Sequence, residues 1–303
     1  MESLRPHPAS QGWREWRVPA ILFLATILST TYAGLFYTQD EPGFLRTLAA
    51  HPALLLKGLY FSFPLIVILL AHELGHYFAC WYHGIRCTPP FFIPLPVTFA
   101  GTMGAFIRIK SPFQHRRALF DVGIAGPLAG FAFVVPALII GIERSTLVLK
   151  NSVPGDIYFG EPLLFRWLAN LLIGYSPGSH DLLADPIAMA AWFGLLVTSL
   201  NLFPIWQLDG GHIAYAMLGR ERQKKVSLVA AMALILISFA GWPIPSYLLF
   251  AGLLLFLSMR SRFYHPPTLS DDERIGTGRM VLGIILFVIL VLSFTPVPIT
   301  MMQ

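Results

Sequence analysis

The stretch from Lys57 to Tyr82 reads KGLYFSFPLIVILLAHELGHYFACWY, a long apolar run with three ionisable residues near its end. The run is longer than the roughly 20 residues that a helix needs to cross the hydrocarbon core of a bilayer. Ionisable side chains are costly at that depth, and they usually serve a function there. His72, Glu73 and His76 therefore indicate a functional site on a membrane-spanning helix.

The spacing of the two histidines predicts a metal site on this helix. Positions i and i+4 of a helix share one face, so His72 and His76 can reach the same zinc ion. Glu73 lies next to the first histidine, where a carboxylate can act as the general base. The alternative is two interfacial histidines beside a Glu that extends to the polar surface. Three ionisable groups on neighbouring turns of an apolar helix favour the metal.

The composition excludes an ordinary water-soluble protein. Apolar residues make up 55% of the 303 residues and charged residues only 12%, about half the usual charged share. Such a chain has too few charges to build a water-exposed surface, and a polytopic membrane protein is expected. The net charge of +5 comes without a continuous basic stretch, so no nucleic-acid partner is expected. Two cysteines are too few for a disulfide framework.

Apolar runs predict about seven transmembrane helices in an all-α protein. The first run follows Arg14 and Arg17 and is long for a signal peptide, so it is read as an uncleaved helix. The division between the fifth and sixth runs, near Pro243 and Pro245, is left open. The expected spans are residues 18–38, 57–82, 118–142, 186–205, 226–241, 243–259 and 279–298.

The distribution of Lys and Arg predicts the orientation of these spans. Seven spans place sixteen of the 21 basic residues on one side of the membrane, and that side is expected to be cytoplasmic. The N-terminus is then cytoplasmic and the C-terminus lies outside. The sixteen residues are Arg5, Arg14, Arg17, Arg86, Arg108, Lys110, Arg116, Arg117, Arg220, Arg222, Lys224, Lys225, Arg260, Arg262, Arg274 and Arg279.

Two connections are long enough to hold structure of their own. The cytoplasmic connection, residues 83–117, is rich in proline, glycine and β-favouring residues, and it predicts a small membrane-associated β-hairpin at about 88–110. An opened substrate segment could pair with this hairpin by strand addition; the alternative is a packed loop. The outer connection, residues 143–185, contains the apolar stretch Leu163–Ile173, which is expected to lie flat at the interface.

A third zinc ligand is expected near the end of the fourth span. Residues 201–212 read NLFPIWQLDGGH, where Pro204 interrupts the helix and two glycines follow Asp209. Asp209 is therefore expected on an irregular segment at membrane depth, which is tolerated only inside protein or beside a wet cavity. The second and fourth spans both end on the cytoplasmic side, so Asp209 can meet the two histidines.

Together these motifs resemble the site-2 protease family of intramembrane zinc metalloproteases, peptidase family M50. The resemblance rests on His72-Glu73-Leu74-Gly75-His76, on Asn-x-x-Pro-x-x-x-Leu-Asp-Gly at 201–210 and on Ala-Gly-Pro-Leu-Ala-Gly at 125–130. It implies one zinc ion held by His72, His76 and Asp209, base catalysis by Glu73, and cleavage of transmembrane segments of membrane proteins. It also implies an integral protein of the bacterial inner membrane.

The chain departs from the family pattern in two places. Gly130 stands where many members have Asn, and no PDZ-like or CBS-like domain is readable, which suggests the compact branch of the family. We expect a single membrane domain, with an N-terminal helix and outer loop at 18–56, a catalytic core at 57–225 and C-terminal helices at 226–303. The oligomeric state is not readable.

Several other residues are weaker candidates. Asn201 is a candidate donor to the oxyanion of the reaction and His212 a weaker one, with helix capping as the alternative for both. Gly126 and Gly130 are expected to pack the third span against the zinc helix. Asp121 is expected in the first turn of its span, where it could orient a zinc-binding histidine. Cys80, one turn beyond His76, is expected in the core.

Three other functions remain open from the sequence. A metal transporter would use the same histidines but would need further polar residues along a path through the membrane, and few are present. A catalytically inactive relative would serve as a membrane scaffold, although all four expected catalytic positions are intact. Other membrane zinc proteases usually take a Glu as the third ligand rather than an Asp.

Overall fold

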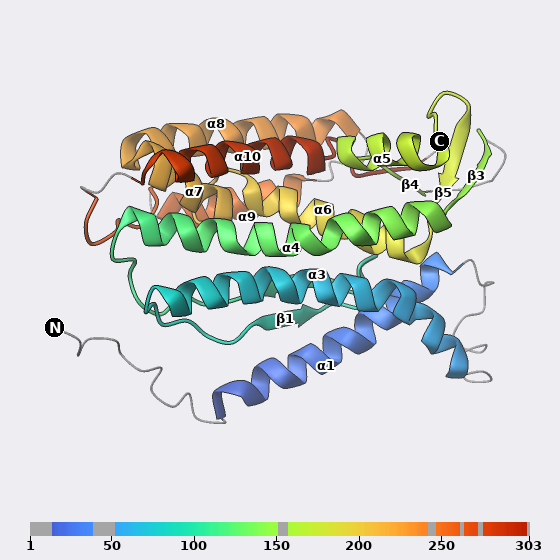
Figure 1. Cartoon of the computed structure of the whole chain (residues 1–303), viewed down its shortest axis with the longest axis horizontal. Coiled ribbons are helices and arrows are strands. Elements are labelled where there is room, and N and C mark those ends of the chain that lie inside the picture. The colour runs from blue at the N-terminus through green and yellow to red at the C-terminus, as the bar shows by residue number, and fades with distance from the viewer. Residues whose placement is uncertain are drawn as a thin grey trace.

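Helices that run side by side along the length of the molecule dominate the computed structural model (Figure 1), which describes residues 14–38, 52–150, 157–241, 247–260, 264–271 and 275–301. Each of the seven expected spans coincides largely with one helix. These helices are α1 (Arg14–Gly34), α3 (Leu55–Tyr82), α4 (Arg116–Arg144), α6 (Pro186–Leu202), α8 (Arg220–Ser238), α9 (Leu248–Arg260) and α10 (Thr277–Ser293).

Four helical segments are long and apolar enough to cross a membrane: Glu15–Tyr37, Leu55–Tyr82, Arg116–Arg144 and Arg220–Gly241. The first ends in the 3₁₀ turn η1 (Leu35–Tyr37) and the last in η3 (Phe239–Gly241), and η2 (Pro52–Leu54) precedes α3. The apolar helices α6, α9 and α10 are shorter, with 17, 13 and 17 residues. At about 1.5 Å per residue they reach roughly 20–25 Å, less than the thickness of the hydrocarbon core.

The fifth and sixth apolar runs form separate helices, α8 and α9, which pack against each other. The residues between them, 242–246, lie outside the described part of the chain. Helix α8 begins earlier than the expected span, at Arg220. The basic cluster from Arg220 to Lys225 therefore forms the first turns of a helix rather than the loop that the sequence suggested.

Helix α4 packs against both α3 and α6, and α1 packs on the other side of α3 (Figure 1). Large side chains fill the space between α3, α4 and α6, because these helices turn apolar faces towards one another. Fully buried members of this core include Phe61, Leu65, Val134, Leu138, Trp192 and Leu195. The result is a three-helix layer in which α3 is covered along most of its length.

The expected β-hairpin is confirmed. Strands β1 (Phe91–Pro94) and β2 (Thr102–Phe106) pair antiparallel, with Phe91 opposite Phe106. The pairing extends towards α3 as an isolated bridge between Cys87 and Ile109. Strand β1 packs against α1 and β2 against α3. The hairpin therefore packs against both α1 and α3.

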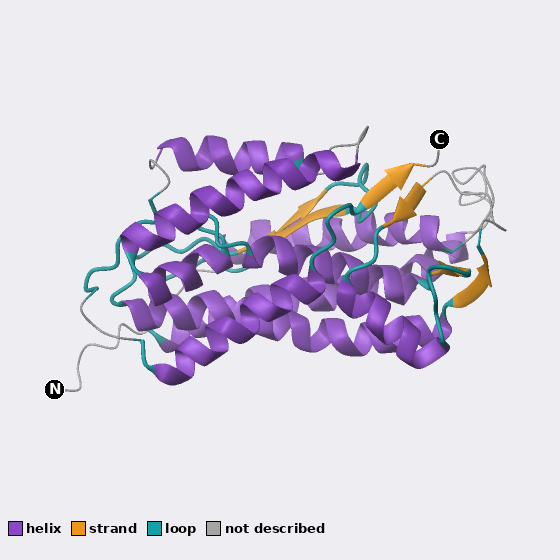
Figure 2. Cartoon of the chain, turned by 90° about the horizontal axis from the view of Figure 1, so that it is seen from above, coloured by secondary structure: helices purple, strands orange, loops and turns teal. Residues whose placement is uncertain are grey.

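The outer connection contains more structure than the sequence indicated. Strand β3 (Thr146–Leu149) pairs with β5 (His180–Leu183), and β4 (Ile157–Phe159) pairs with β6 (Ile299–Met301). Figure 2 shows that these strands are short and lie beside the helices or at their ends rather than forming one sheet.

Between β4 and β5, the stretch Leu163–Ile173, which was expected at the membrane interface, forms helix α5. In Figure 1 α5 continues in line with α10. It packs against α4 and α10 and buries Leu164, Phe165 and Leu168, and this packing holds it along the bundle.

Candidate metal centre

Helix α3 presents His72, Glu73 and His76 inside the protein, and all three side chains are buried. The two imidazoles point to the same place, as their spacing of four residues requires, with the Nε2 atoms 3.1 Å apart. His76 lies six residues before the end of α3 at Tyr82, which places it about 9 Å along the axis from that end. The site is thus well inside the bundle.

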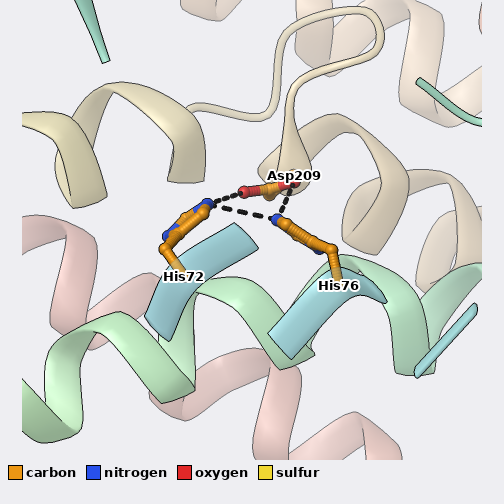
Figure 3. A group of neighbouring side chains, drawn as sticks. All are labelled: His72, His76 and Asp209. Carbon is orange, nitrogen blue, oxygen red and sulfur yellow. Dashed lines mark hydrogen bonds and ion pairs between the residues drawn. The ribbon is translucent and has the colours of Figure 1, made fainter. Parts of the chain in front are cut away.

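Asp209 completes the cluster from another part of the chain. Its Oδ2 atom lies 3.2 Å from Nε2 of His72 and its Oδ1 atom 3.3 Å from Nε2 of His76 (Figure 3). The irregular segment that the sequence indicated covers Phe203 to Leu208, and it follows the end of α6. The sequence thus predicted that Asp209 would meet the two histidines.

The local structure at Asp209 needs a correction. Asp209 is the first residue of helix α7 (Asp209–Leu218), not a member of the irregular segment. No helix was expected here, because two glycines follow Asp209 and glycine has a low helix propensity. Packing of α7 against α4 and α8 stabilises it all the same.

The three residues fit a zinc ion. One ligand atom from each lies within 4.8 Å of the others, and His72, His76 and Asp209 form the group of this kind found in the described part of the chain. Oδ2 of Asp209 is buried and accepts no hydrogen bond from the described residues. A buried carboxylate oxygen without a donor is costly, and a cation removes that cost. Two imidazole nitrogens and a carboxylate oxygen are ligands that zinc takes in proteins.

The orientation of His76 is fixed by α4. Nδ1 of His76 lies 2.8 Å from the backbone carbonyl of Val122, so Nδ1 carries the hydrogen and Nε2 is left free to bind a metal. Gly126 makes this approach possible, since a Cβ there would overlap the imidazole of His76. A Cβ on Gly130, one turn on, would lie 3.2 Å from Cβ of His72, which is a tight contact rather than an overlap. The predicted packing of these glycines against the zinc helix is confirmed.

Asp121 does not orient a zinc-binding histidine. Its carboxylate accepts two hydrogen bonds from Arg279 and lies 3.0 Å from Nε2 of His83. The acceptor for His76 is instead the backbone carbonyl of the next residue, Val122, which no side-chain pattern could reveal. Cys80, also considered near the site, is fully buried in the core as predicted.

Two neighbours of the cluster differ in their suitability as oxyanion donors. Nδ2 of Asn201, in the last turn of α6, lies 3.3 Å from Nε2 of His72 and therefore beside the cluster. Nδ1 of His212 lies 2.6 Å from Nε2 of His265 and is already engaged. The geometry therefore favours Asn201 over His212.

The β-hairpin connection also reaches the site. The carboxyl of Glu73 contacts the backbone at Ile107, just after β2. Neither Ile107 nor His265 was a sequence candidate, because an apolar strand residue and a distant loop histidine carry no motif. Their roles depend on contacts between segments far apart in the chain.

Comparison with known families agrees with this geometry. Residues 60–241 match the family model described as "Peptidase family M50", and this region contains His72, His76 and Asp209. The chain belongs to peptidase family M50. Since the match covers more than half of the 303 residues, the membership concerns the body of the molecule and not a short motif.

Relatives of this family member include plant chloroplast proteins. The chain is 31% identical over 224 residues to the probable zinc metalloprotease EGY2 of Oryza sativa subsp. indica, covering 74% of this chain and 40% of that protein. It is 31% identical over 249 residues to EGY2 of Arabidopsis thaliana, covering 80% and 43%. It is 30% identical over 241 residues to the probable zinc metalloprotease EGY1 of Arabidopsis thaliana, covering 78% and 42%.

The chain thus spans about two fifths of the length of the curated relatives it matches. No solved structure matches the chain.

Proposed function

We propose that this M50 family member is an intramembrane zinc metalloendopeptidase that cleaves transmembrane segments of membrane proteins. The observation that carries the proposal is the cluster of His72, His76 and Asp209, in which both histidines are buried on α3, a helix long enough to cross a membrane. The names of the relatives, probable zinc metalloproteases, support the same activity.

In this proposal His72, His76 and Asp209 hold one zinc ion. When bound, zinc supplies a Lewis acid that lowers the pKa of water and polarises a carbonyl. Glu73 takes the proton from the attacking water and returns it to the leaving amine, since it is buried beside His72. The carbonyl of Val122 holds His76 in the tautomer that leaves Nε2 free.

Asn201 has two possible roles at this site. Its amide can donate to the oxyanion that develops during attack, or it can orient His72. We assign it the first role because its amide nitrogen lies 3.3 Å from Nε2 of His72, the ring atom that also lies beside Asp209.

The substrate helix must open before its peptide bonds can be cut, and its backbone then needs partners. In the described part of the chain, β1 and β2 pair only with each other, so each keeps one edge without a strand partner. We propose that the opened segment adds to this hairpin as a further strand. The contact between Ile107 and Glu73 would bring such a strand to the catalytic base.

The topology belongs to the proposal as well. All seven of α1, α3, α4, α6, α8, α9 and α10 would cross the membrane, the three short ones with local thinning or side-chain adjustment. The N-terminus would be cytoplasmic, and the site would open towards the cytoplasm, because basic residues gather at that end. The whole chain would form one membrane domain, located in the inner membrane of a bacterium. The matching relatives are chloroplast proteins, so cell fractionation of the native source tests this location.

The activity is tested by co-expressing the protein with a library of single-span membrane proteins and comparing wild type with Glu73→Gln. The expected result is cleavage by wild type only, with equal zinc content in both proteins. Retained cleavage by Glu73→Gln would remove Glu73 from the mechanism. Zinc binding without cleavage by wild type would favour a scaffold, and zinc uptake into vesicles would favour a transporter.

The same variant tests the strand-addition proposal, because zinc-bound Glu73→Gln should retain its substrate uncut. A photo-crosslinking residue at exposed Met103 of β2 is expected to capture the substrate, while the same residue at exposed Leu249 of α9 serves as the control. Equal capture at both positions would argue against the hairpin as the docking strand.

A further inference from the structure

The two cysteines of the chain meet at the end of α3. Cys80 lies in the last turn of this helix and Cys87 follows seven residues later, which on a continuous helix would separate them by about 10 Å along the axis. The helix instead ends at Tyr82, and Gly84 turns the chain with a φ of 66°. The backbone N–H of Ile85 then donates to the carbonyl of Cys80 at 2.8 Å. This reversal brings Cys87 back to Cys80.

The two cysteine side chains lie in one buried cluster. Their thiols lie within hydrogen-bonding reach of each other, and no disulfide joins them. Both side chains are buried in a small cluster with Ile85, Ala118 and Val122. Among the described residues they do not belong to a group of three metal-binding side chains, so the pair offers thiol chemistry rather than a second metal site.

Cys87 also belongs to the base of the β-hairpin. We define the hairpin arm as residues 85–110, the segment that contains β1 and β2. At its base Cys87 forms a bridge with Ile109, and the N–H of Thr88 donates to the carbonyl of Arg108 at 2.9 Å. A covalent bond from Cys87 to Cys80 would therefore join the arm to α3, one turn beyond His76.

The surroundings make Cys87 the more reactive thiol. The hydrogen bond from Cys80 lowers the pKa of Cys87, and the positive charge of Lys110 acts in the same direction against the effect of burial. The thiolate is the form that attacks an oxidant. Cys80 is then in place as the thiol that resolves the oxidised product.

We propose that Cys80 and Cys87 form a reversible redox site in which a peroxide converts the two thiols to a disulfide that fixes the hairpin arm to α3. The Cys87 thiolate attacks one peroxide oxygen, so the O–O bond breaks and Cys87 becomes a sulfenic acid. The sulfur of Cys80 then attacks the sulfur of Cys87 and displaces water. In sum, two thiols and one hydrogen peroxide give one disulfide and two waters, and a dithiol reductant reverses the change.

The purified full chain in detergent tests the chemistry without any need for proteolytic activity. After treatment with hydrogen peroxide, the protein is denatured, alkylated with iodoacetamide and weighed by mass spectrometry. Wild type should lose two hydrogens and take up no alkyl group, and dithiothreitol should restore two alkylations. The Cys80→Ser variant should instead gain oxygen at Cys87, because it lacks the resolving thiol.

Hydrogen exchange tests the consequence for the arm. The amides of residues 85–88 and 108–110 should exchange several-fold more slowly in the oxidised protein than in the reduced one, with no such change in peroxide-treated Cys80→Ser. Two alkylated thiols after peroxide treatment, a disulfide between two copies of the chain, or unchanged exchange in the arm would each overturn the proposal.

Discussion

Arg279, at the start of α10, donates two hydrogen bonds to the carboxylate of Asp121 near the start of α4, from Nε to Oδ1 at 2.7 Å and from Nη2 to Oδ2 at 2.8 Å. Asp121 immediately precedes Val122, whose carbonyl orients His76. The ion pair therefore fixes the part of α4 on which one ligand of the metal cluster depends.

Arg279→Ala should both destabilise the protein and weaken zinc binding. It removes two charge-assisted hydrogen bonds from a carboxylate that is largely shielded from solvent, at a cost of about 1–3 kcal/mol. The measurements are thermal unfolding and the zinc-to-protein ratio after dialysis against a weak chelator. Arg222→Ala, at an exposed position of α8, is the matched control. Identical zinc retention in the two variants would show that the ion pair between Arg279 and Asp121 does not contribute to zinc binding.

Asn201→Ala should lower kcat by about 10²–10³-fold with little change in KM or zinc content, if Asn201 donates to the oxyanion. If Asn201 only orients His72, zinc affinity should fall instead and added zinc should restore the rate. Steady-state kinetics with and without excess zinc distinguish the two roles. A variant with normal kcat at saturating zinc would exclude the oxyanion role.

Gly126→Ala should displace His76 and reduce zinc binding at least tenfold, because the added methyl group would overlap the imidazole. Competition with a chromogenic chelator measures the affinity. Gly252→Ala in α9 is the control, since a Cβ there meets no atom within 4 Å. We expect that control to bind zinc normally and to be unchanged or slightly more stable. Normal zinc binding by Gly126→Ala would show that α4 can move away from α3.

The contact of residues 264–271 with α7 should weaken in acid. Burial lowers the pKa of His265 from 6.5 to about 4, so the unfolded segment binds a proton more readily than the folded one between these values. Stability is therefore complete above about pH 6.5 and is lost as the pH falls towards 4. Hydrogen exchange of the 264–271 amides should accelerate over that range. After correction for the pH dependence of intrinsic amide exchange, the exchange rate in His265→Gln should depend less on pH than in wild type. If exchange in His265→Gln depends on pH as steeply as in wild type, an ionisable group other than His265 causes the dependence.

The sequence predicted that His72, His76 and Asp209 would meet, because their placement follows local rules. His72 and His76 share a helix face, and Asp209 follows an interrupted apolar run that was expected to end on the same side of the membrane as they do. The hairpin was predictable for the same reason, since proline, glycine and β-branched residues disfavour a helix there. The limits of the zinc helix were also close, with 57–82 expected and Leu55–Tyr82 observed.

Contacts between distant segments were not predictable. The carbonyl of Val122 has no side-chain signature, and the pairing of His212 with His265 joins positions 53 residues apart. Helix α7 was missed because two adjacent glycines lower its intrinsic propensity and only packing restores it. Strand β6 pairs with β4 from the far end of the chain, a partner that no local pattern in either strand specifies.

Residues that support the metal cluster lie outside residues 60–241, the region that matches the family model. Arg279 and His265 both follow residue 241, where the family match ends, yet one holds α4 and the other contacts α7, the helix that Asp209 begins. A fragment cut at the family boundaries would keep His72, His76 and Asp209 and lose both supporting residues. Attempts to transplant or minimise this protein should therefore carry α9, α10 and the segment between them as part of the unit.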